Sequence, residues 1–443
     1  MAELAPATVA AAGLCIGCGA CGGPMRWTAH ALREATGTVP SAAVARTCPF
    51  SPDAADEDTI AAAAFPEAPI RDPHLGRHEA TYVGHVMEGD FRAGGSSGGM
   101  VSWVAAELLR TGAIDGVLHV VPTAPETGGY FAYRISRSAA EIAEGARSRY
   151  HPVDMAAVLA EVRATPGRYA VVGIPCFIKA VNLLRREDAV MAQRIVATLG
   201  LFCGHMKSRR FVDSFAWQLG ADPDAVRAVE YRRKDAGRPA NWYTAHLTLA
   251  DGTTRQQDWW HLADGDWGAG FFQAGACDYC DDVVAETADV SFGDAWVEPY
   301  SSDGRGTNVV VVRAPAVARM IADAIGAGRL ALEPVDADFV RETQAAGFRH
   351  RREGLAWRLA AFPPKLPLRK RVAPGVADVS RRRRLVYRTR RHIARWSHRV
   401  ARLARITGAP GLYIRWGRAM LALYQGLAYD RGRWGAAFKR LGL

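Results

Sequence analysis

Three cysteines stand two residues apart near the start of the chain, and this spacing restricts the fold more than any other feature. The run reads Cys15-Ile-Gly-Cys18-Gly-Ala-Cys21, and Cys48 follows later, directly before a proline. Three thiolates in a tight glycine-containing loop can hold one face of an iron–sulfur cube, and a more distant fourth cysteine completes the set. Zinc sites usually pair two C-x2-C knuckles instead. The spacing therefore predicts a [4Fe–4S] cluster, with Cys48 in place of the close fourth cysteine of bacterial ferredoxins, a position that is Met25 here.

The other four cysteines lie far apart in the sequence. They are Cys176, Cys203, Cys277 and Cys280. A lone cysteine is more often a small core residue than a ligand. Here, however, Cys176 and Cys203 each follow a β-rich run, and the carboxyl ends of parallel strands meet at the edge where α/β proteins bind ligands. With the C-x2-C pair Cys277-Asp-Tyr-Cys280, these positions predict a second [4Fe–4S] cluster.

The composition of the chain favours cysteines that stay reduced and bind metals. Apolar residues make up 49% of the chain and charged residues 23%, as in ordinary globular proteins. The sequence has no run of roughly 18 apolar residues that would suggest a membrane helix. Its start carries Glu3 but no basic residue of a secretory signal. We therefore expect a cytoplasmic protein, in which thiols stay reduced and bind metals rather than form disulfides.

Strand-like and helix-like segments alternate through the middle of the chain. Short β-rich runs occupy residues 117–121, 169–174, 195–203, 288–292 and 309–312. Residues 100–110 place their apolar side chains on one helical face and end at Thr111-Gly112. Alternation of this kind predicts an α/β core.

A glycine- and serine-rich loop directly precedes that helix. It reads Gly94-Gly-Ser-Ser-Gly-Gly99. Glycines let the backbone approach a ligand closely, and the start of a helix offers free N–H groups to phosphate. The loop is neither G-x-G-x-x-G nor a P-loop, and an ordinary flexible loop would look the same. The position before an amphipathic helix makes it a candidate cofactor site.

Several motifs in order resemble one known family, that of the coenzyme F420 hydrogenase and formate dehydrogenase beta subunits, which includes 7-hydroxymethyl chlorophyll a reductase. The stretches are Leu14–Cys21, Gly95–Ser102, Val172–Cys176, Gly200–Cys203, Cys277–Cys280 with residues 288–295, and Gly306-Thr307 before residues 308–313. The resemblance runs from about residue 10 to 345. It implies non-covalent FAD and one or more [4Fe–4S] clusters, and the N-terminal set is most similar to the chlorophyll-reductase branch.

The resemblance also suggests which residues meet the flavin and the substrate. It places Gly95, Ser96, Ser97, Gly98 and Gly99 in the flavin and substrate loop, with Thr307 nearby, and gives Cys176, Cys203, Cys277 and Cys280 the cluster nearest the flavin. The family often has Ser-Lys-Tyr where this chain has Ser148-Arg149-Tyr150, which keeps the cation but removes a proton donor, because arginine does not release its proton. Asp294, at a strand end before Trp296, is the carboxylate that we expect to hydrogen-bond the cofactor. No catalytic residue is assigned.

Three functions are compatible with these features. The favoured one is an iron–sulfur flavoprotein oxidoreductase that passes electrons between a ferredoxin-like donor or acceptor and a small organic substrate, through the N-terminal cluster, the second cluster and FAD. The second is a beta subunit that reduces or oxidises coenzyme F420 within a hydrogenase or formate dehydrogenase complex. The third is a structural or nucleic-acid-binding iron–sulfur protein. A nucleic acid partner is not expected, because the basic tail carries no nucleic-acid motif.

The chain ends in a strongly basic segment. From Lys365 onward, 21 Lys and Arg stand against two acids, whereas the whole chain has a net charge of only +11, so the preceding body is acidic. One helical face of this tail gathers Leu385, Ile393, Trp396, Val400, Leu403 and Ile406. Such a face packs on the body or on a partner subunit, which we favour, or binds an anionic membrane surface from the cytoplasmic side. A homo-oligomer is also open, and we expect the tail to be dispensable for cofactor binding.

These observations predict an α/β protein in three parts. Residues 10–62 form a ferredoxin-like iron–sulfur N-terminal segment, residues 80–345 an α/β flavin-binding core with the second cluster, and residues 365–443 a basic helical C-terminal extension.

Overall fold

A central sheet of eight strands organises the computed structural model, which describes residues 3–124, 129–376 and 379–442. The strand order is β15-β5-β14-β13-β9-β8-β6-β7. The bounds are β5 (Ala80–Val86), β6 (Gly116–Pro122), β7 (Phe131–Ser136), β8 (Tyr169–Gly173), β9 (Ile195–Leu201), β13 (Val290–Asp294), β14 (Asn308–Val312) and β15 (Leu330–Pro334). Strands β6, β8, β9 and β13 run parallel, and the strands on both sides pair antiparallel. The predicted α/β core is confirmed, as a mixed sheet.

Helices cover both faces of this sheet, as side-chain alternation along the strands requires. Val117 and Ala170 pack into a core with α5 (Met100–Arg110), α6 (Ala139–Glu144) and α11 (Pro315–Gly326). Their neighbours Leu118 and Val171 point the opposite way and pack against α7 (Ala156–Ala164), α8 (Pro175–Glu187) and α9 (Ala189–Arg194). The predicted helix at residues 100–110 has the bounds of α5. Both faces of the central strands are therefore buried.

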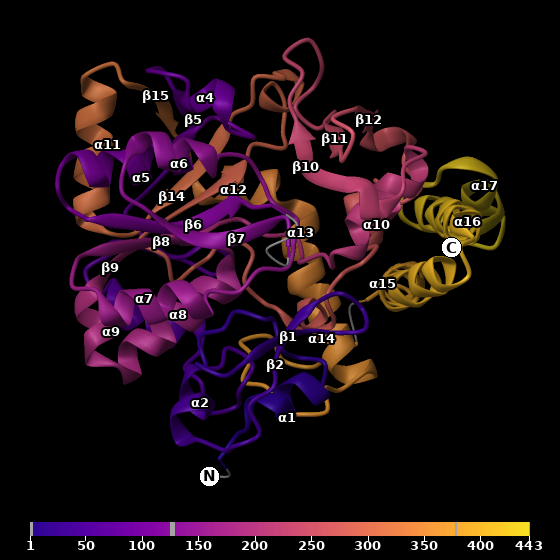
Figure 1. The fold of residues 1–443 in the computed structure, drawn as a ribbon, viewed down its shortest axis with the longest axis horizontal. Helices are drawn as coiled ribbons and strands as arrows, with labels where there is room; N and C mark the ends of the chain where they lie inside the picture. The colour runs from indigo at the N-terminus through magenta and orange to yellow at the C-terminus, as the bar shows by residue number, and fades with distance from the viewer. Residues whose placement is uncertain (1–2, 125–128, 377–378, 443) are drawn as a thin grey trace.

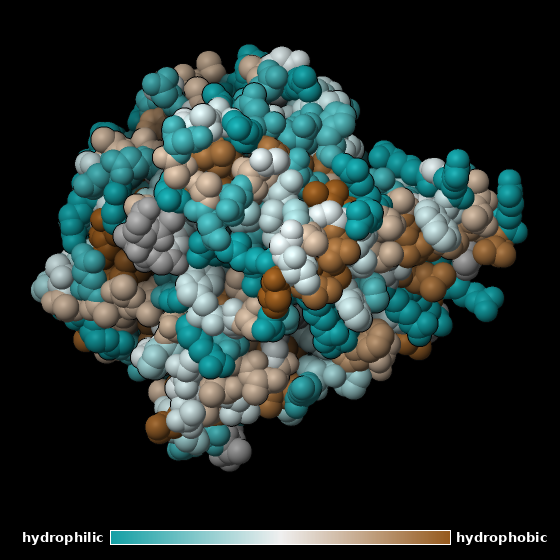
Figure 2. All heavy atoms as spheres, turned by 45° about the vertical axis from the view of Figure 1, so that its right-hand side comes forward, coloured by the Kyte–Doolittle hydropathy of each residue, from teal (hydrophilic) through white to brown (hydrophobic). Residues whose placement is uncertain are grey.

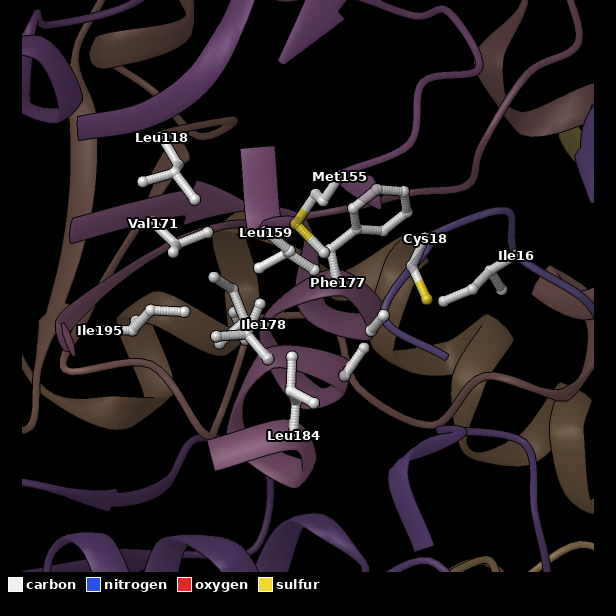
Figure 3. Close-up of a cluster of buried hydrophobic side chains, with 14 of the residues drawn as sticks. Ile16, Cys18, Leu118, Met155, Leu159, Val171, Phe177, Ile178, Leu184 and Ile195 are labelled. Atoms are coloured by element: carbon white, nitrogen blue, oxygen red, sulfur yellow. The ribbon is translucent and has the colours of Figure 1, made fainter. Parts of the chain in front are cut away.

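The N-terminal segment lies below the sheet against α8 and is built from short elements (Figure 1). They are α1 (Pro6–Ala11), β1 (Met25–Trp27), β2 (Arg33–Ala35), α2 (Ala42–Thr47) and α3 (Glu57–Ala64). Ile16 and Cys18 of this segment pack in the same buried cluster as Phe177 of α8 and Met155 (Figure 3). Leu366, Leu368 and Val372 also contact this cluster from the far end of the chain. The segment is therefore joined to the sheet layer by apolar packing.

A second, three-stranded sheet carries the C-terminal extension. It consists of β10 (Val226–Arg233), β11 (Thr244–Leu249) and β12 (Thr254–Asp258), and it shares a core with α10 (Arg210–Gln218). The helices α15 (Arg381–Ile406), α16 (Pro410–Tyr429) and α17 (Gly432–Arg440) project beside α10 (Figure 1). Ile393, Tyr413 and Leu427 of the extension are buried in this core. The extension thus packs on the body, as favoured from the sequence.

The apolar face predicted for the tail is only partly right. Ile393 is buried, whereas Trp396, Leu403 and Ile406 are 42%, 52% and 72% exposed. The packed side of α15 instead includes the small residues Ser397, Ala401 and Ala404, which let the helix approach its neighbours closely. Figure 2 shows apolar patches among hydrophilic side chains on the projecting part of the molecule. In the described part of the chain, no helix is both long and apolar enough to span a membrane.

Candidate functional site

The N-terminal cysteine set comprises Cys15, Cys18, Cys21 and Cys48. Gly17 and Gly19 have φ of +70° and +79°, and a Cβ on either would lie 2.7 Å from a backbone atom of Arg33 or Ala156, so the loop needs glycine at both positions. The Sγ of Cys15 accepts a hydrogen bond from the backbone N–H of Ala35 at 3.4 Å. Cys48 follows the last turn of α2. A local loop and one helix end therefore build this set.

The four sulfurs of this set lie within electrostatic reach of one another. Burial raises the pKa of Cys18 well above its ordinary value, and the charges of Cys21, Cys48 and Cys15 raise it further. Burial likewise raises the pKa of Cys48 to about 12. Thiolates gathered without water are unfavourable unless a cationic group holds them. An iron–sulfur cluster, which takes four thiolates, fits this donor set.

The core cysteine set comprises Cys176, Cys203, Cys277 and Cys280, and it lies at the carboxyl ends of two neighbouring parallel strands. Cys176 follows β8 and sits in the first turn of α8, while Cys203 comes two residues after β9. Cys277 lies in the 3-10 turn η5 (Gly275–Tyr279), and Cys280 ends it. The sheet edge therefore gathers cysteines that the sequence keeps far apart.

The core set shows the same mutual repulsion, and like the N-terminal set it has one buried and three partly buried cysteines. Burial raises the pKa of Cys176 well above its ordinary value, with contributions from Cys280, Cys203 and Cys277. Burial also raises the pKa of Cys203 to about 11. The Sγ of Cys277 accepts a hydrogen bond from the backbone N–H of Met206 at 3.3 Å. This donor set also fits a four-thiolate cluster. Among the residues described, no three His, Cys, Asp or Glu side chains are grouped as for one metal ion.

The two cysteine sets adjoin each other. The charge of Cys18 contributes to the raised pKa of Cys176. Tyr133 lies near both, because its pKa is raised first by burial and then by Cys176 and Cys18. Its hydroxyl donates to the carbonyl of Val172 at 3.0 Å, and its ring stacks on Phe177 with centroids 6.2 Å apart. The fold therefore brings the two cysteine sets close to each other.

The glycine loop is held in a tight fit at the start of α5. A Cβ on Gly98 would lie 2.7 Å from the carbonyl oxygen of Gly84 and 2.9 Å from the backbone nitrogen of Asn308, so only glycine fits. The Oγ of Ser96 accepts from the backbone N–H of Ser148 at 2.7 Å. The Oγ of Ser97 donates to the carbonyl of Thr307 at 2.8 Å. The structure thus joins the predicted loop to the Arg149-Tyr150 segment and to Thr307.

Two cations that the sequence analysis did not single out lie against this loop. Arg232 forms a two-bond ion pair with Asp294, at 2.9 and 3.2 Å, and reaches the carbonyl of Ser96 at 3.4 Å. Lys234 donates to the carbonyls of Arg92, Ser97 and Arg305 at 2.6, 3.0 and 2.7 Å. Burial, and then the charge of Arg92, lower the pKa of Lys234 to about 8. The two cations and the glycines make a setting that suits the pyrophosphate of FAD. The carboxylate of Asp294, which the sequence predicts to hydrogen-bond the cofactor, is paired with Arg232 in this structure.

Arg149 and Tyr150 line the inner side of the loop. The Arg149 guanidinium lies over the Phe131 ring, 5.1 Å from its centroid, and burial lowers its pKa to about 10. The Tyr150 ring contacts Trp267 with centroids 4.6 Å apart, and Trp267 stacks on His205 at 4.3 Å. His205 is two residues beyond Cys203. A row of ring contacts therefore runs from Tyr150 through Trp267 to His205, which is close in sequence to Cys203.

A cavity of about 640 Å³ borders the loop on its outer side. Its lining includes Gly84, His85, Arg92, Arg305 and Thr307. A larger depression of about 790 Å³ lies along α12 (Ala337–Thr343) and α13 (Ala345–Arg351) and contains no predicted site residue. Cavity size alone therefore does not mark the functional site.

Comparison with known proteins agrees with this arrangement. Residues 81–160 match the family model for the N-terminal part of the coenzyme F420 hydrogenase/dehydrogenase beta subunit, and residues 167–338 match the model for its C-terminal part. Together the two models span more than half of the chain. These matches define the chain as an FAD- and iron–sulfur-dependent oxidoreductase. It belongs to the coenzyme F420 hydrogenase/dehydrogenase beta subunit family, which confirms the resemblance seen in the sequence.

One solved structure supports the same fold. It is a chain of the F420-reducing [NiFe] hydrogenase complex from Methanosarcina barkeri, 17% identical, with a TM-score of 0.51. The similarity covers 68% of this chain and 99% of that one. No curated protein matches the chain. The cysteine run at residues 15–21 and the basic extension both lie outside the two family models.

Proposed function

We propose that this chain carries electrons between a ferredoxin-like partner and a small organic substrate, using two [4Fe–4S] clusters and FAD. The observation that carries the proposal is the convergence of eight cysteines into two adjoining sets, one reached from the N-terminal segment and one at the sheet edge. Iron–sulfur clusters exchange single electrons, and a bound flavin supplies two-electron chemistry. A chain that holds both can connect a one-electron partner with an organic substrate.

The residues of each site have distinct roles in this proposal. The N-terminal set, in a ferredoxin-like segment, holds the cluster that faces the partner, and the core set holds the cluster next to FAD. Gly95, Ser96, Ser97, Gly98 and Gly99 shape the flavin site, with Thr307 beside them. Lys234 adds positive charge beside the phosphates, whereas the charge of Arg232 is balanced by its ion pair with Asp294. Arg149 and Tyr150 line the side on which the substrate would bind, and Arg149 acts as an anion-binding group rather than a proton donor.

A second candidate is the oxidation or reduction of coenzyme F420 as a subunit of a larger complex. The family description and the structural relative from an F420-reducing hydrogenase favour it. An anionic cofactor would suit the cations Arg92 and Arg305 at the outer cavity. The long basic extension lies outside both family models. It is the main feature of this chain that the second candidate role does not account for.

One experiment tests both candidates. The full chain is purified without air, its iron and released flavin are quantified, and the reduced protein is offered ferredoxin, coenzyme F420 and pyridine nucleotides in turn. We expect both flavin and iron–sulfur absorption, with electron exchange with ferredoxin. Exchange with F420 alone would favour the second candidate, and iron without flavin would contradict both.

We also infer a contact surface on the extension. Trp396, Leu403 and Ile406 are exposed on α15 among arginines, of which Arg399 lies over the Trp396 ring at 5.2 Å. An apolar strip with basic flanks suits an anionic membrane surface. The rest of the helix packs on the body, so this contact would be peripheral.

A further inference from the structure

The side chain of Lys234 joins three separate segments around the glycine loop. Lys234 follows directly after β10. Its Nζ donates to the backbone carbonyls of Arg92, Ser97 and Arg305 at 2.6, 3.0 and 2.7 Å. These carbonyls belong to α4 (Phe91–Gly94), to the glycine loop and to the turn that precedes β14. An ammonium group has three N–H donors and no acceptor, so these bonds use all of its hydrogen-bonding capacity.

Lys234 is bound to backbone oxygens rather than to an acid. The carboxylates nearby already have arginine partners. Asp303 pairs with Arg92 and Arg305 at 3.0 and 2.8 Å, and Asp294 pairs with an arginine of β10 as described above. Within the described ranges, no salt bridge joins Lys234 to a carboxylate. The three carbonyls are therefore the partners that fix the position of this ammonium group.

The loop and the turn are in direct backbone contact beside this lysine. Gly306 has a φ of +84°, and a Cβ on it would lie 2.8 Å from the Cα of Ser97. In the part of the chain that the structure describes, no other group donates to the carbonyl oxygens of Ser97 and Arg305. Lys234 is thus the donor that satisfies both segments where they meet.

We propose that Lys234 is a positioning residue, which holds the glycine loop against the turn at residues 303–306 in the shape that binds FAD. This inference rests on the flavin site proposed above. A loop that is ordered before the cofactor arrives loses less conformational entropy on binding, and this increases affinity. Because its three donors are used within the protein, Lys234 acts through the loop and donates no hydrogen bond to phosphate. FAD binding then depends on the arrangement of these donors and not on the charge alone.

Arginine is the substitution that separates arrangement from charge. A guanidinium group is planar, and its donors lie in one plane, whereas the donors of an ammonium group form a tripod. K234R therefore keeps the charge but cannot reproduce the three bonds, and K234M removes both. Arg233 is exposed at the end of β10, so R233M removes one positive charge from the neighbouring position and leaves these bonds in place.

The test measures the FAD affinity of the iron-loaded full-length protein, by equilibrium dialysis without air. K234M and K234R should each bind FAD at least about tenfold more weakly, as expected when about one hydrogen bond to a charged group is lost. R233M should bind FAD as the wild type does. Iron content should be equal in all four proteins, which shows that the fold is intact.

A second measurement follows the loop in the absence of flavin. Exchange of backbone N–H groups with solvent reports local opening of a structure. In flavin-free protein, residues 95–99 and 303–307 should exchange faster in K234M and K234R than in the wild type and R233M. A lysine that only attracted phosphate would leave this exchange unchanged.

Each outcome bears on the proposal. A K234R protein that binds FAD as tightly as the wild type would overturn it, and so would weaker FAD binding with unchanged exchange of the loop. If K234M does not fold, K234R and R233M carry the test. A wild type without flavin, or a Gly98→Ala variant with undiminished flavin, would instead remove the flavin site on which the proposal rests. The exchange measurement would then still show whether Lys234 holds the loop.

Discussion

The two cysteine sets are built in opposite ways. Three members of the N-terminal set come from one seven-residue loop, whose shape depends on Gly17 and Gly19. The core set depends on the register of β8 and β9 and on the distant turn η5. Local sequence therefore places three of the four cysteines of the first set, and only Cys48 comes from a more distant helix end. The second set exists only if the sheet forms, because tertiary structure brings its members together.

The largest effect that we expect is the loss of one cluster in a cysteine variant while the cluster of the other set remains. We expect about eight irons per chain in the wild type and about four in Cys277→Ser, because a four-iron cluster requires its thiolates. The EPR signal that survives should be that of the N-terminal set. Cys18→Ser is the matched variant and should leave the other signal. Loss of both signals in Cys277→Ser would show that the two sets are not independent.

The proposed flavin site lies in the α/β core, as the core cysteine set does. Gly98→Ala places a Cβ against backbone atoms of Gly84 and Asn308, so the loop must shift, and we expect FAD to bind at least about tenfold more weakly, ~1.4 kcal/mol. Gly94→Ala is the control, since no atom of the described residues lies within 4 Å of its Cβ. Released flavin is quantified beside the iron of the N-terminal set. Equal flavin in the two variants would place the flavin elsewhere.

The same contrast explains what the sequence could predict. The strands at residues 117–121, 169–174 and 309–312 are apolar runs, and the structure confirms them together with α5. Strand β12 was missed because its sequence, Thr-Arg-Gln-Gln-Asp, is polar and mostly exposed, without apolar alternation. The alternating strands β5, β10 and β11 were not predicted either. The sequence pattern therefore identified the continuous apolar runs but not the strands in which polar and apolar residues alternate.

Long-range ion pairs could not be predicted from the sequence for a related reason. A basic run such as Arg232 to Lys234 looks like a solvated surface, and nothing local shows that Asp294 or the glycine loop lies opposite. Arg371 is a similar case, since its partner Glu286 stands far away in the chain. The sequence identified the groups that carry chemistry, but the fold determines which charges surround them.

The segment after Phe362 joins the N-terminal segment to the core through ion pairs, which bears on the expectation that the whole tail is dispensable for the cofactors. Arg371 pairs with Glu286 at 2.6 Å and lies 3.8 Å from Glu57 of the N-terminal segment. Arg371→Met should lower the free energy of unfolding by up to about 3–5 kcal/mol, because it removes the nearest cation from buried Glu286, which then keeps only Arg352 at 3.5 Å. Arg369→Met, in a half-exposed pair with Asp56, should cost less than about 1 kcal/mol. Denaturant unfolding measures both.

The loss of folding stability in Arg371→Met should depend on pH, and the direction of that dependence follows from Glu286. Burial raises the pKa of Glu286 to about 7, above its value in an unfolded chain, although Arg371 opposes the shift. A carboxyl with a raised folded pKa binds more protons when folded, so its contribution to stability is lost as pH rises. Without Arg371 that pKa rises further. The difference in stability between Arg371→Met and the wild type should therefore shrink from pH 8 to pH 6, and a constant difference would exclude Glu286 as the cause.

The smallest expected effect concerns the exposed strip of α15, formed by Trp396, Leu403 and Ile406. Each basic residue near an anionic membrane contributes about 1 kcal/mol of attraction, which salt weakens. We expect full-length protein to float with anionic liposomes at low salt and less at high salt. The variant Trp396→Ser/Leu403→Ser/Ile406→Ser should float less, while its iron and flavin stay unchanged because these side chains are exposed. Equal flotation of variant and wild type would exclude the strip as a membrane contact, and packing on the body, as Ile393 does, would then be the role of this helix's apolar residues.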